Sequence, residues 1–216
     1  MDHHFITPSA LAAILHRHDA PAILDLRMAD DAAADPRTLP CAQTITLAEI
    51  EAGAGPTGSV VTCCQKGGKI SQLAAGMLRA RGVPALSLRH GHLGWVAAGL
   101  QLRRVGRPAD RWVMPLDPGW DDLAALWVLR RLVDRTAPIL PVERDWLSAA
   151  ADIWDARILP PTPVAMAELA VLDHPAVDAL GGGPTALLAG RLTRVATPED
   201  TLDLVDDWLA GAQVAA

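Results

Sequence analysis

Cysteine is scarce in this chain, which limits the ways in which the protein is held together. Three of the 216 residues are cysteines: Cys41, Cys63 and Cys64. They are too few and too irregularly spaced for a disulfide framework or for a zinc site with four protein ligands. Cys63 and Cys64 are adjacent, and adjacent cysteines rarely pair with each other. We therefore expect reduced thiols, as in a bacterial cytoplasmic protein.

Long apolar runs and an excess of positive charge are missing as well. No stretch approaches the roughly 20 apolar residues that span a bilayer, and residues 1–4 lack the pattern of a signal peptide. The formal net charge of −6 argues against nucleic acid as a partner. Half of the residues are hydrophobic and 20% are charged, which is typical of a globular protein. The sequence predicts a cytoplasmic protein with neither a membrane nor a nucleic-acid partner, and leaves the oligomeric state open.

The first half of the chain predicts alternating strands and helices. The expected strands are short β-branched or aliphatic runs at residues 22–26, 59–63 and 85–88. A helix is expected over residues 9–15, with Thr7 as N-cap and Pro8 in the first turn. A second helix is expected over residues 71–81 and ends at Gly82. This alternation predicts an α/β fold whose parallel sheet is flanked by helices and binds ligands at the carboxyl ends of its strands.

Two connecting segments are less regular. Residues 30–40 are polar, contain two prolines and are expected to form a loop. Residues 44–47 fit either a small strand or the beginning of a short helix.

A glycine-containing loop follows the strand at residues 59–63 and begins at Cys64. Its amide N–H groups and those of the next helix are expected to point toward whatever this cysteine carries. Lys66 and Lys69 add two positive charges. A helix start and nearby cations favour the thiolate, which is the nucleophilic form of cysteine. The loop therefore predicts a nucleophilic cysteine that holds an anionic group.

Several motifs occur in a fixed order around this loop. They are residues 6–8 with Leu11, the strand at residues 24–27, the loop residues Cys64, Gly67 and Lys69, and a final segment with Gly91, Trp95 and residues 98–100. In this order and spacing, residues 5–103 resemble the rhodanese family of sulfurtransferases.

The resemblance implies a role for each part of the loop. Cys64 would take a sulfane sulfur as a persulfide and pass it to a thiophilic acceptor, without a cofactor or a metal. The amides that would surround this sulfur and bind the donor belong to Gln65, Lys66, Gly67, Gly68, Lys69 and Ile70. Asp25 and Arg27 would belong to an internal polar network and not to the catalytic groups.

Loop length separates sulfur chemistry from phosphate chemistry. Cysteine phosphatases of a related fold have an arginine six positions after the cysteine, where this chain has Ile70. Isoleucine cannot bind phosphate oxygens, so we favour sulfur transfer over phosphate hydrolysis. The cation lies one residue earlier, at Lys69, where sulfurtransferases usually carry arginine. Lysine lacks the bidentate fork of arginine, but together with Lys66 it favours a small anionic donor such as thiosulfate, with a thiol as acceptor.

The second half has fewer diagnostic motifs. A linker is expected at residues 106–108, strands at residues 111–114 and 138–142, and a turn at residues 117–119. Helices are expected over residues 120–134, 143–154 and 198–209, the last with Thr197 as N-cap. Residues 160–163, rich in proline, and the glycines at 181–183 are expected to separate these pieces. Six of the seven tryptophans follow position 100, which suggests that indoles anchor the core of this half.

Three of these pieces, residues 111–113, 127–134 and 187–208, resemble the chromate-resistance domain that is fused to rhodanese domains in some bacterial proteins. The chain departs from that pattern at Ala125 and Leu126, where relatives have Cys-Pro, and it lacks their stretch with histidine and cysteine near residues 160–174. The resemblance implies a rhodanese-like domain over residues 1–105 and a smaller, mostly helical domain over residues 106–216. It also gives an alternative function, in which the protein binds or senses chromate or sulfate with little turnover.

Some residues allow a structural interpretation beside the functional one. Cys64 could be a buried structural thiol, and Cys63 is expected in the core with its side chain opposite to that of its neighbour. Cys41 fits either a structural thiol or a resolving thiol at the rim of the site. His90 and His92 are expected as a solvated loop pair, with a position at the mouth of the Cys64 loop as the alternative. His3, His4, His16 and His18 are expected at the surface. The pair Arg130–Arg131 is expected on a solvated or salt-bridged face, with binding of an oxyanion as the alternative.

Overall fold

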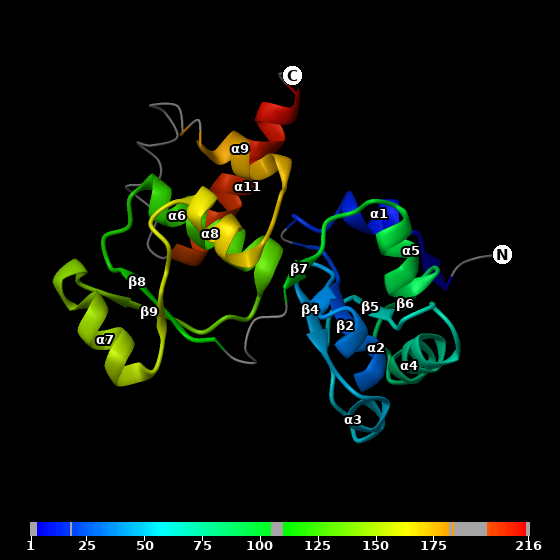
Figure 1. Cartoon of the computed structure of the whole chain (residues 1–216). Coiled ribbons are helices and arrows are strands. Elements are labelled where there is room, and N and C mark those ends of the chain that lie inside the picture. Colours follow the sequence, from blue (N-terminus) through cyan, green and yellow to red (C-terminus); the bar gives the residue numbers. More distant parts are fainter. Residues whose placement is uncertain (1–3, 18, 105–109, 182, 184–197, 215–216) are drawn as a thin grey trace. The chain divides into compact units, whose positions relative to one another are not determined.

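The chain forms two compact units, Met1–Val105 and Gly106–Ala216, each with its own internal contacts. The structure, a computed structural model, describes residues 4–17, 19–104, 110–181, 183 and 198–214 (Figure 1).

A five-stranded parallel sheet forms the centre of the first unit. Its strands lie in the order β1-β6-β5-β2-β4. Their bounds are β1 Phe5–Ile6, β2 Ala22–Asp25, β4 Ala42–Thr44, β5 Val60–Cys63 and β6 Ala85–Leu88. In the register of β2 and β5, Asp25 lies opposite Cys63, so the ends of these two strands meet at one edge of the sheet. The predicted parallel sheet flanked by helices is confirmed.

Helices cover both faces of this sheet (Figure 1). Their bounds are α1 Pro8–Ala12, α2 Ala29–Ala34, α3 Leu47–Glu51, α4 Lys69–Ala80 and α5 Gly91–Ala97. Leu11 of α1 and Trp95 of α5 pack with Ile23 on one face. Leu78 of α4 packs with Leu24 on the other. Ile23 and Leu24 are neighbours in β2, so the alternation of a strand supplies both cores.

The ends of the helices follow local rules. The Thr7 hydroxyl accepts a hydrogen bond from the Ala10 amide at the start of α1, with Pro8 in the first turn, as predicted. Helix α4 begins two residues earlier than expected, and Gly82 follows its end with a φ of +82°. Residues 44–47 satisfy both interpretations of the sequence, since β4 ends at Thr44 and α3 begins at Leu47.

The prediction of a polar loop over residues 30–40 is wrong. Residues Ala29–Ala34 form helix α2, and Arg37–Thr38 form strand β3, which pairs with β7 (Arg103–Arg104) in a small antiparallel ladder. Alanine has the highest helix propensity, and Asp30 and Asp31 lie in the first turn, where the helix dipole favours negative charge. The two prolines lie outside this helix, so they did not exclude it.

In the residues that the structure describes, the second unit contains a three-stranded parallel sheet and is otherwise mostly helical. The strand order is β10-β8-β9, with β8 Trp112–Pro115, β9 Ile139–Val142 and β10 Arg157–Ile158. The helices are α6 Trp120–Val128, the π-helical turn η1 Leu129–Val133, the 3-10 turn η2 Arg144–Trp146, α7 Leu147–Trp154, α8 Pro163–Ala170, α9 Pro175–Gly181 and α11 Pro198–Val214. The predicted strands at 111–114 and 138–142 and the three predicted helices match these elements, whereas β10, α8 and α9 were missed.

Helix α8 begins inside the segment that was predicted to be a proline-rich break. The Thr162 hydroxyl accepts a hydrogen bond from the Ala165 amide, and Pro163 occupies the first turn. Proline is tolerated there because the first N–H groups of a helix have no intrahelical partner. The predicted N-cap Thr197 and the first part of the segment 187–208 lie outside the described residues.

Tryptophans contribute to the core of the second unit, although not all of them. Trp112 and Trp127 are buried, and the rings of Trp120 and Trp208 meet edge to face with centroids 5.4 Å apart. Trp146 is exposed, so the prediction that the indoles anchor the core does not hold for this residue. Arg131 pairs with Asp206 at 2.8 Å, in line with the structural interpretation of the arginine pair.

None of the helices in the described ranges has both the length and the apolar character that crossing a lipid bilayer requires. In the same ranges, histidine, cysteine and carboxylate side chains form no group of three or more that could hold a metal ion.

Candidate functional site

Cys64 is the first residue after β5, at the carboxyl edge of the parallel sheet. Strand β5 ends at Cys63, and helix α4 begins at Lys69 with Gly68 as its N-cap residue. The loop between them is short, so the first turn of α4 directs its free amide groups back toward Cys64. The strand and the helix thus fix both ends of the cysteine loop.

The segment after β6 supports the cysteine loop from outside. The amides of His92 and Leu93 donate hydrogen bonds to the carbonyl oxygens of Cys64, at 2.9 Å, and Gln65, at 3.0 Å. The two segments approach closely at Gly67 and Gly91, which both have positive φ, +64° and +58°. A Cβ on Gly67 would lie 2.6 Å from the Leu88 carbonyl oxygen, and one on Gly91 would overlap the Cys64 carbonyl. Glycine is therefore needed at both positions for the backbone conformation and for the close approach.

Hydrogen-bond donors surround the sulfur of Cys64. Backbone amides of Lys66, Gly68 and Ser71 hydrogen-bond to it, and the Ser71 Oγ lies 3.2 Å from the Sγ. Ser71 is itself held in place, because its hydroxyl accepts a hydrogen bond from Ser87 at 3.1 Å. Its one proton is shared between two acceptors: the Gly68 carbonyl oxygen, to which it donates at 3.2 Å, and the sulfur once Cys64 is a thiolate. The sulfur thus sits against a ring of N–H and O–H groups.

These groups act on the ionisation of the thiol. Burial raises the pKa of Cys64, but the hydrogen bonds from the Ser71 side chain and from the amides of Ser71, Gly68 and Lys66 outweigh it, so the pKa lies below its ordinary value. The effect on the neighbouring thiol is the opposite. Burial, with no comparable set of donors, raises the pKa of Cys63 well above its ordinary value. Of the two adjacent cysteines, Cys64 is the one poised to be a thiolate.

Replacing Ser71 by alanine is expected to raise the pKa of Cys64, because the thiolate loses one of its donors. The thiolate forms as pH rises through the pKa, so the pH profile of Cys64 alkylation by iodoacetamide shifts to higher pH in Ser71→Ala. Peptide mapping after timed alkylation measures this rate for Cys64 alone. Ser87→Ala is the matched control, since it removes a hydroxyl of the same chain of hydrogen bonds that does not touch the sulfur. An unchanged profile in Ser71→Ala would contradict the assignment.

A pocket of about 460 Å³ opens beside Cys64. We call it the cysteine pocket; it is lined by Leu26, Met28, Asp31, Cys64, Gln65, Lys66, Gly68, Lys69 and Ile70. Cys64 is only 7% exposed, so the sulfur lies at a recessed position. Lys66 and Lys69 are exposed, and Asp31 is the one acidic lining residue. Of the loop residues that the sequence singled out, all but Gly67 line this pocket, and Gly67 is buried against the segment after β6.

Asp25 and Arg27 form a buried ion pair next to the site. Arg27 Nε lies 2.9 Å from Asp25 Oδ2, and both side chains are more than nine-tenths buried. The guanidinium also donates to the carbonyl oxygens of Asp35 and Arg37, and the Thr38 hydroxyl donates to Asp25. These bonds attach the segment between α2 and β3 to the end of β2. This is the kind of internal polar network that the sequence resemblance implied for the pair.

The prediction that His92 is solvated is wrong. His92 is buried, and its Nε2 lies 3.2 Å from Asp35 Oδ2. Burial lowers the pKa of His92, while the Arg37 side chain, which donates to Asp35, holds the pKa of that carboxyl well below its ordinary value. His90 is exposed, as predicted, with a left-handed φ of +60°. Sequence reasoning could not pair His92 with Asp35, because the two are far apart in the chain.

Ser71 is a residue of the site that the sequence analysis did not predict. The sequence contained one indication of its role, because a hydroxyl residue in the first turn of the helix after the cysteine can reach back to the loop.

Cys63 is buried, as predicted, and its side chain joins the core under α1 and α5, whereas Cys64 contacts the core under α3 and α4. Cys41 is buried at the start of β4 with a φ of +57° and does not line the cysteine pocket. Its proposed role as a resolving thiol stays a prediction.

No protein-family model and no curated protein matches this chain. Similar solved structures do exist, and they match the N-terminal part, about 45% of the chain. That part resembles rhodanese homologues. A rhodanese homologue from Thermus thermophilus is 30% identical, with 42% of this chain and 98% of that chain covered and a TM-score of 0.35.

Two further structures show the same pattern. A rhodanese-like domain protein from Staphylococcus aureus is 22% identical, with 42% of this chain and 89% of that chain covered and a TM-score of 0.37. A thiosulfate sulfurtransferase from Pseudomonas aeruginosa is 26% identical, with 46% of this chain and 20% of that chain covered and a TM-score of 0.38. The three structures named here match the N-terminal part of the chain.

Proposed function

We propose that the first unit is a sulfurtransferase that carries a sulfane sulfur as a persulfide on Cys64. The observation that carries the proposal is the set of donors around one sulfur atom, namely the amides of Lys66, Gly68 and Ser71 together with the Ser71 hydroxyl. Such a set favours the thiolate of Cys64, which is the form that attacks the sulfur donor and the form to which Cys64 returns when the persulfide is discharged.

The first half of the reaction loads the cysteine. The Cys64 thiolate attacks the outer sulfur of thiosulfate, an S–S bond forms to Cys64, and the S–S bond of the donor breaks with its electron pair leaving on sulfite. Lys66 and Lys69 lie on the lining of the same pocket and lower the repulsion between the thiolate and the dianionic donor. No external oxidant or reductant is needed, because the sulfur moves as a neutral atom between two nucleophiles.

Phosphate ester hydrolysis fits the pocket less well. Ile70 lines the pocket at the position where an arginine would bind phosphate oxygens, and the two lysines are point charges without its planar fork. The donors described above converge on the sulfur itself. This arrangement supports a thiolate nucleophile that attacks a sulfane sulfur, with thiosulfate as the donor to test first.

Incubation with thiosulfate followed by intact-mass measurement tests the proposal. The wild-type protein is expected to gain the mass of one sulfur atom, and cyanide is expected to remove it as thiocyanate. A chain that stays at its original mass after prolonged incubation with thiosulfate would count against the function. If chromate or sulfate bound in calorimetry while no sulfur was gained, the oxyanion-binding alternative would take its place.

A further inference from the structure

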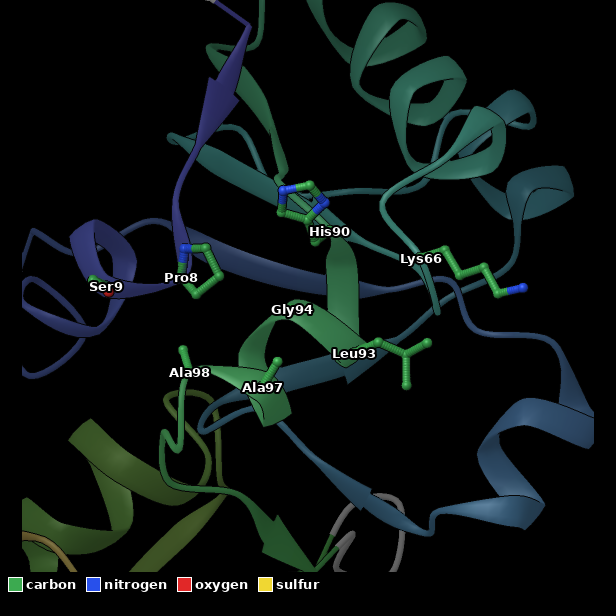
Figure 2. A pocket seen from close by; sticks show the side chains of 8 residues that line it. All are labelled: Pro8, Ser9, Lys66, His90, Leu93, Gly94, Ala97 and Ala98. Atoms are coloured by element: carbon green, nitrogen blue, oxygen red, sulfur yellow. The ribbon is translucent and has the colours of Figure 1, made fainter.

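A second pocket lies next to the cysteine pocket and shares one residue with it. We call it the α5 pocket; it has a volume of about 600 Å³ and is lined by Pro8, Ser9, Lys66, His90, Leu93, Gly94, Ala97 and Ala98. Figure 2 shows Pro8 and Ser9 at one end and Lys66 at the other, with the residues of α5 between them. Lys66 lines both pockets, so a ligand could extend from Cys64 past Lys66 along α5.

The two pockets expose more apolar surface than a small donor needs. The exposed large hydrophobic side chains among the described residues of the first unit are Met28, Leu73, Leu93 and Val96. Met28 lines the cysteine pocket and is 60% exposed, and Leu93 lines the α5 pocket and is 44% exposed. Thiosulfate and cyanide have only a few atoms and gain nothing from such side chains. Exposed apolar residues beside a reactive group are typical of a surface that a larger partner covers.

The charged residues that line the cysteine pocket indicate which partner would bind there. Lys66 and Lys69 lie on the lining of the cysteine pocket, in a protein whose formal net charge is −6. In Figure 2 the Lys66 ammonium group points outward, away from the other residues of the α5 pocket. A carboxylate of the partner would meet this lysine before the partner's thiol reaches the sulfur. Asp31, on the same lining, disfavours a second carboxylate beside Met28.

We infer that the sulfur acceptor is a cysteine of a polypeptide that has an acidic residue beside the cysteine and an apolar residue that enters the α5 pocket. This inference rests on the proposed function. The acceptor thiolate attacks the outer sulfur of the Cys64 persulfide, a new S–S bond forms on the acceptor, and the old S–S bond breaks with its electron pair returning to Cys64. The acceptor becomes a persulfide, and Cys64 returns to its thiolate. Two anions meet in this step, so a lysine beside them increases its rate.

Discharge of a preloaded protein tests the inference. The persulfide is formed with thiosulfate, excess donor is removed, and the loss of the extra sulfur is followed by quenched intact-mass measurement. Three acetylated tripeptide amides serve as acceptors: Glu-Cys-Leu, Gln-Cys-Leu and Glu-Cys-Ser. Cyanide and 2-mercaptoethanol serve as acceptors without a peptide. We expect Glu-Cys-Leu to discharge the protein at least about fivefold faster than either of the other two peptides, at equal thiolate concentration.

Two variants with a matched control locate the effect. Leu93→Ser removes an apolar wall of the α5 pocket but keeps the backbone amide that donates to Gln65. It is expected to slow discharge by Glu-Cys-Leu about fivefold, with discharge by cyanide and loading by thiosulfate unchanged. Ala97→Glu adds a negative charge to the same wall and is expected to lower the rate of discharge by Glu-Cys-Leu in the same way. Leu73→Ser is the control, because Leu73 has a similar exposure of 50% and lines neither pocket.

The outcomes separate this inference from the proposed function. If the persulfide forms and the three peptides and 2-mercaptoethanol discharge it at equal rates, the inference is overturned and the sulfurtransferase proposal stands. The same holds if Leu93→Ser and Leu73→Ser behave alike, or if small neutral thiols are faster than every peptide. If thiosulfate loads no sulfur at all, both proposals fall together.

Discussion

Replacing Cys64 by serine is expected to remove the sulfur-dependent mass increment completely. Serine has a similar size and carries a hydroxyl in place of the thiol, but an alcohol is not ionised near neutral pH and forms no persulfide. Transfer of sulfur from thiosulfate to cyanide is expected to fall by at least about a thousandfold, to the background rate, because the covalent intermediate is lost. Intact mass after incubation with thiosulfate and a colorimetric thiocyanate assay measure the two effects.

The neighbouring cysteine provides the control for this result. Cys63 is fully buried in the other core of the sheet, and burial raises the pKa of its thiol. Cys63→Ala is therefore expected to keep the full mass increment, at a stability cost of about 1 kcal/mol for the small cavity. A mass increment that persists in Cys64→Ser, or that disappears in a folded Cys63→Ala, would contradict the assignment of the persulfide to Cys64.

Replacing Asp25 by asparagine is expected to destabilise the first unit by about 3–5 kcal/mol, because it leaves the Arg27 guanidinium buried without its counter-ion. The two side chains are 6% and 2% exposed, so water cannot take the place of the carboxylate. Asparagine keeps the shape and one acceptor oxygen, but the charge is lost. Urea denaturation followed by circular dichroism measures the change, and hydrogen exchange of the amides in β2 and β5 assigns it to the first unit.

An exposed pair of the same kind provides the comparison. Arg17 Nε lies 2.9 Å from Asp19 Oδ1, but both side chains are 54% exposed. Exposed pairs are screened by water and salt, so Asp19→Asn is expected to change the free energy of unfolding by less than about 1 kcal/mol. Equal effects of the two substitutions would show that burial does not determine the contribution of Asp25.

Local patterns account for most of what the sequence predicted correctly. The strands at β2, β5 and β6 and the cysteine loop are each encoded within a few residues by an aliphatic run followed by glycine or polar residues. Helix α2 was not predicted, because Pro36 and Pro40 follow closely after its alanines and prolines are typical of loops. The same Thr-Pro signal that correctly began α1 at Thr7 was present at Thr162, where the prolines before it suggested a break.

Contacts between distant residues account for the rest. His92 is buried because Asp35, which follows α2, meets its ring, and no periodicity in either segment indicates the other. The role of Ser71 depends on the Ser87 hydroxyl from the adjacent strand as well as on the cysteine loop. In the second unit, β8 pairs in parallel with both β9 and β10, and short isolated runs do not reveal which strands become neighbours.

The two adjacent thiols face opposite sides of the sheet, and this decides what can happen to a sulfur once it is bound. A vicinal dithiol would collapse a persulfide into a disulfide and release hydrogen sulfide within the protein itself. Here the Cys63 side chain lies in the apolar core beneath α1 and α5, whereas Cys64 contacts the core on the other face of the sheet. If Cys64 carries a persulfide as proposed, the outer sulfur is protected from Cys63, and we expect its lifetime to depend on the arrival of a thiol from outside.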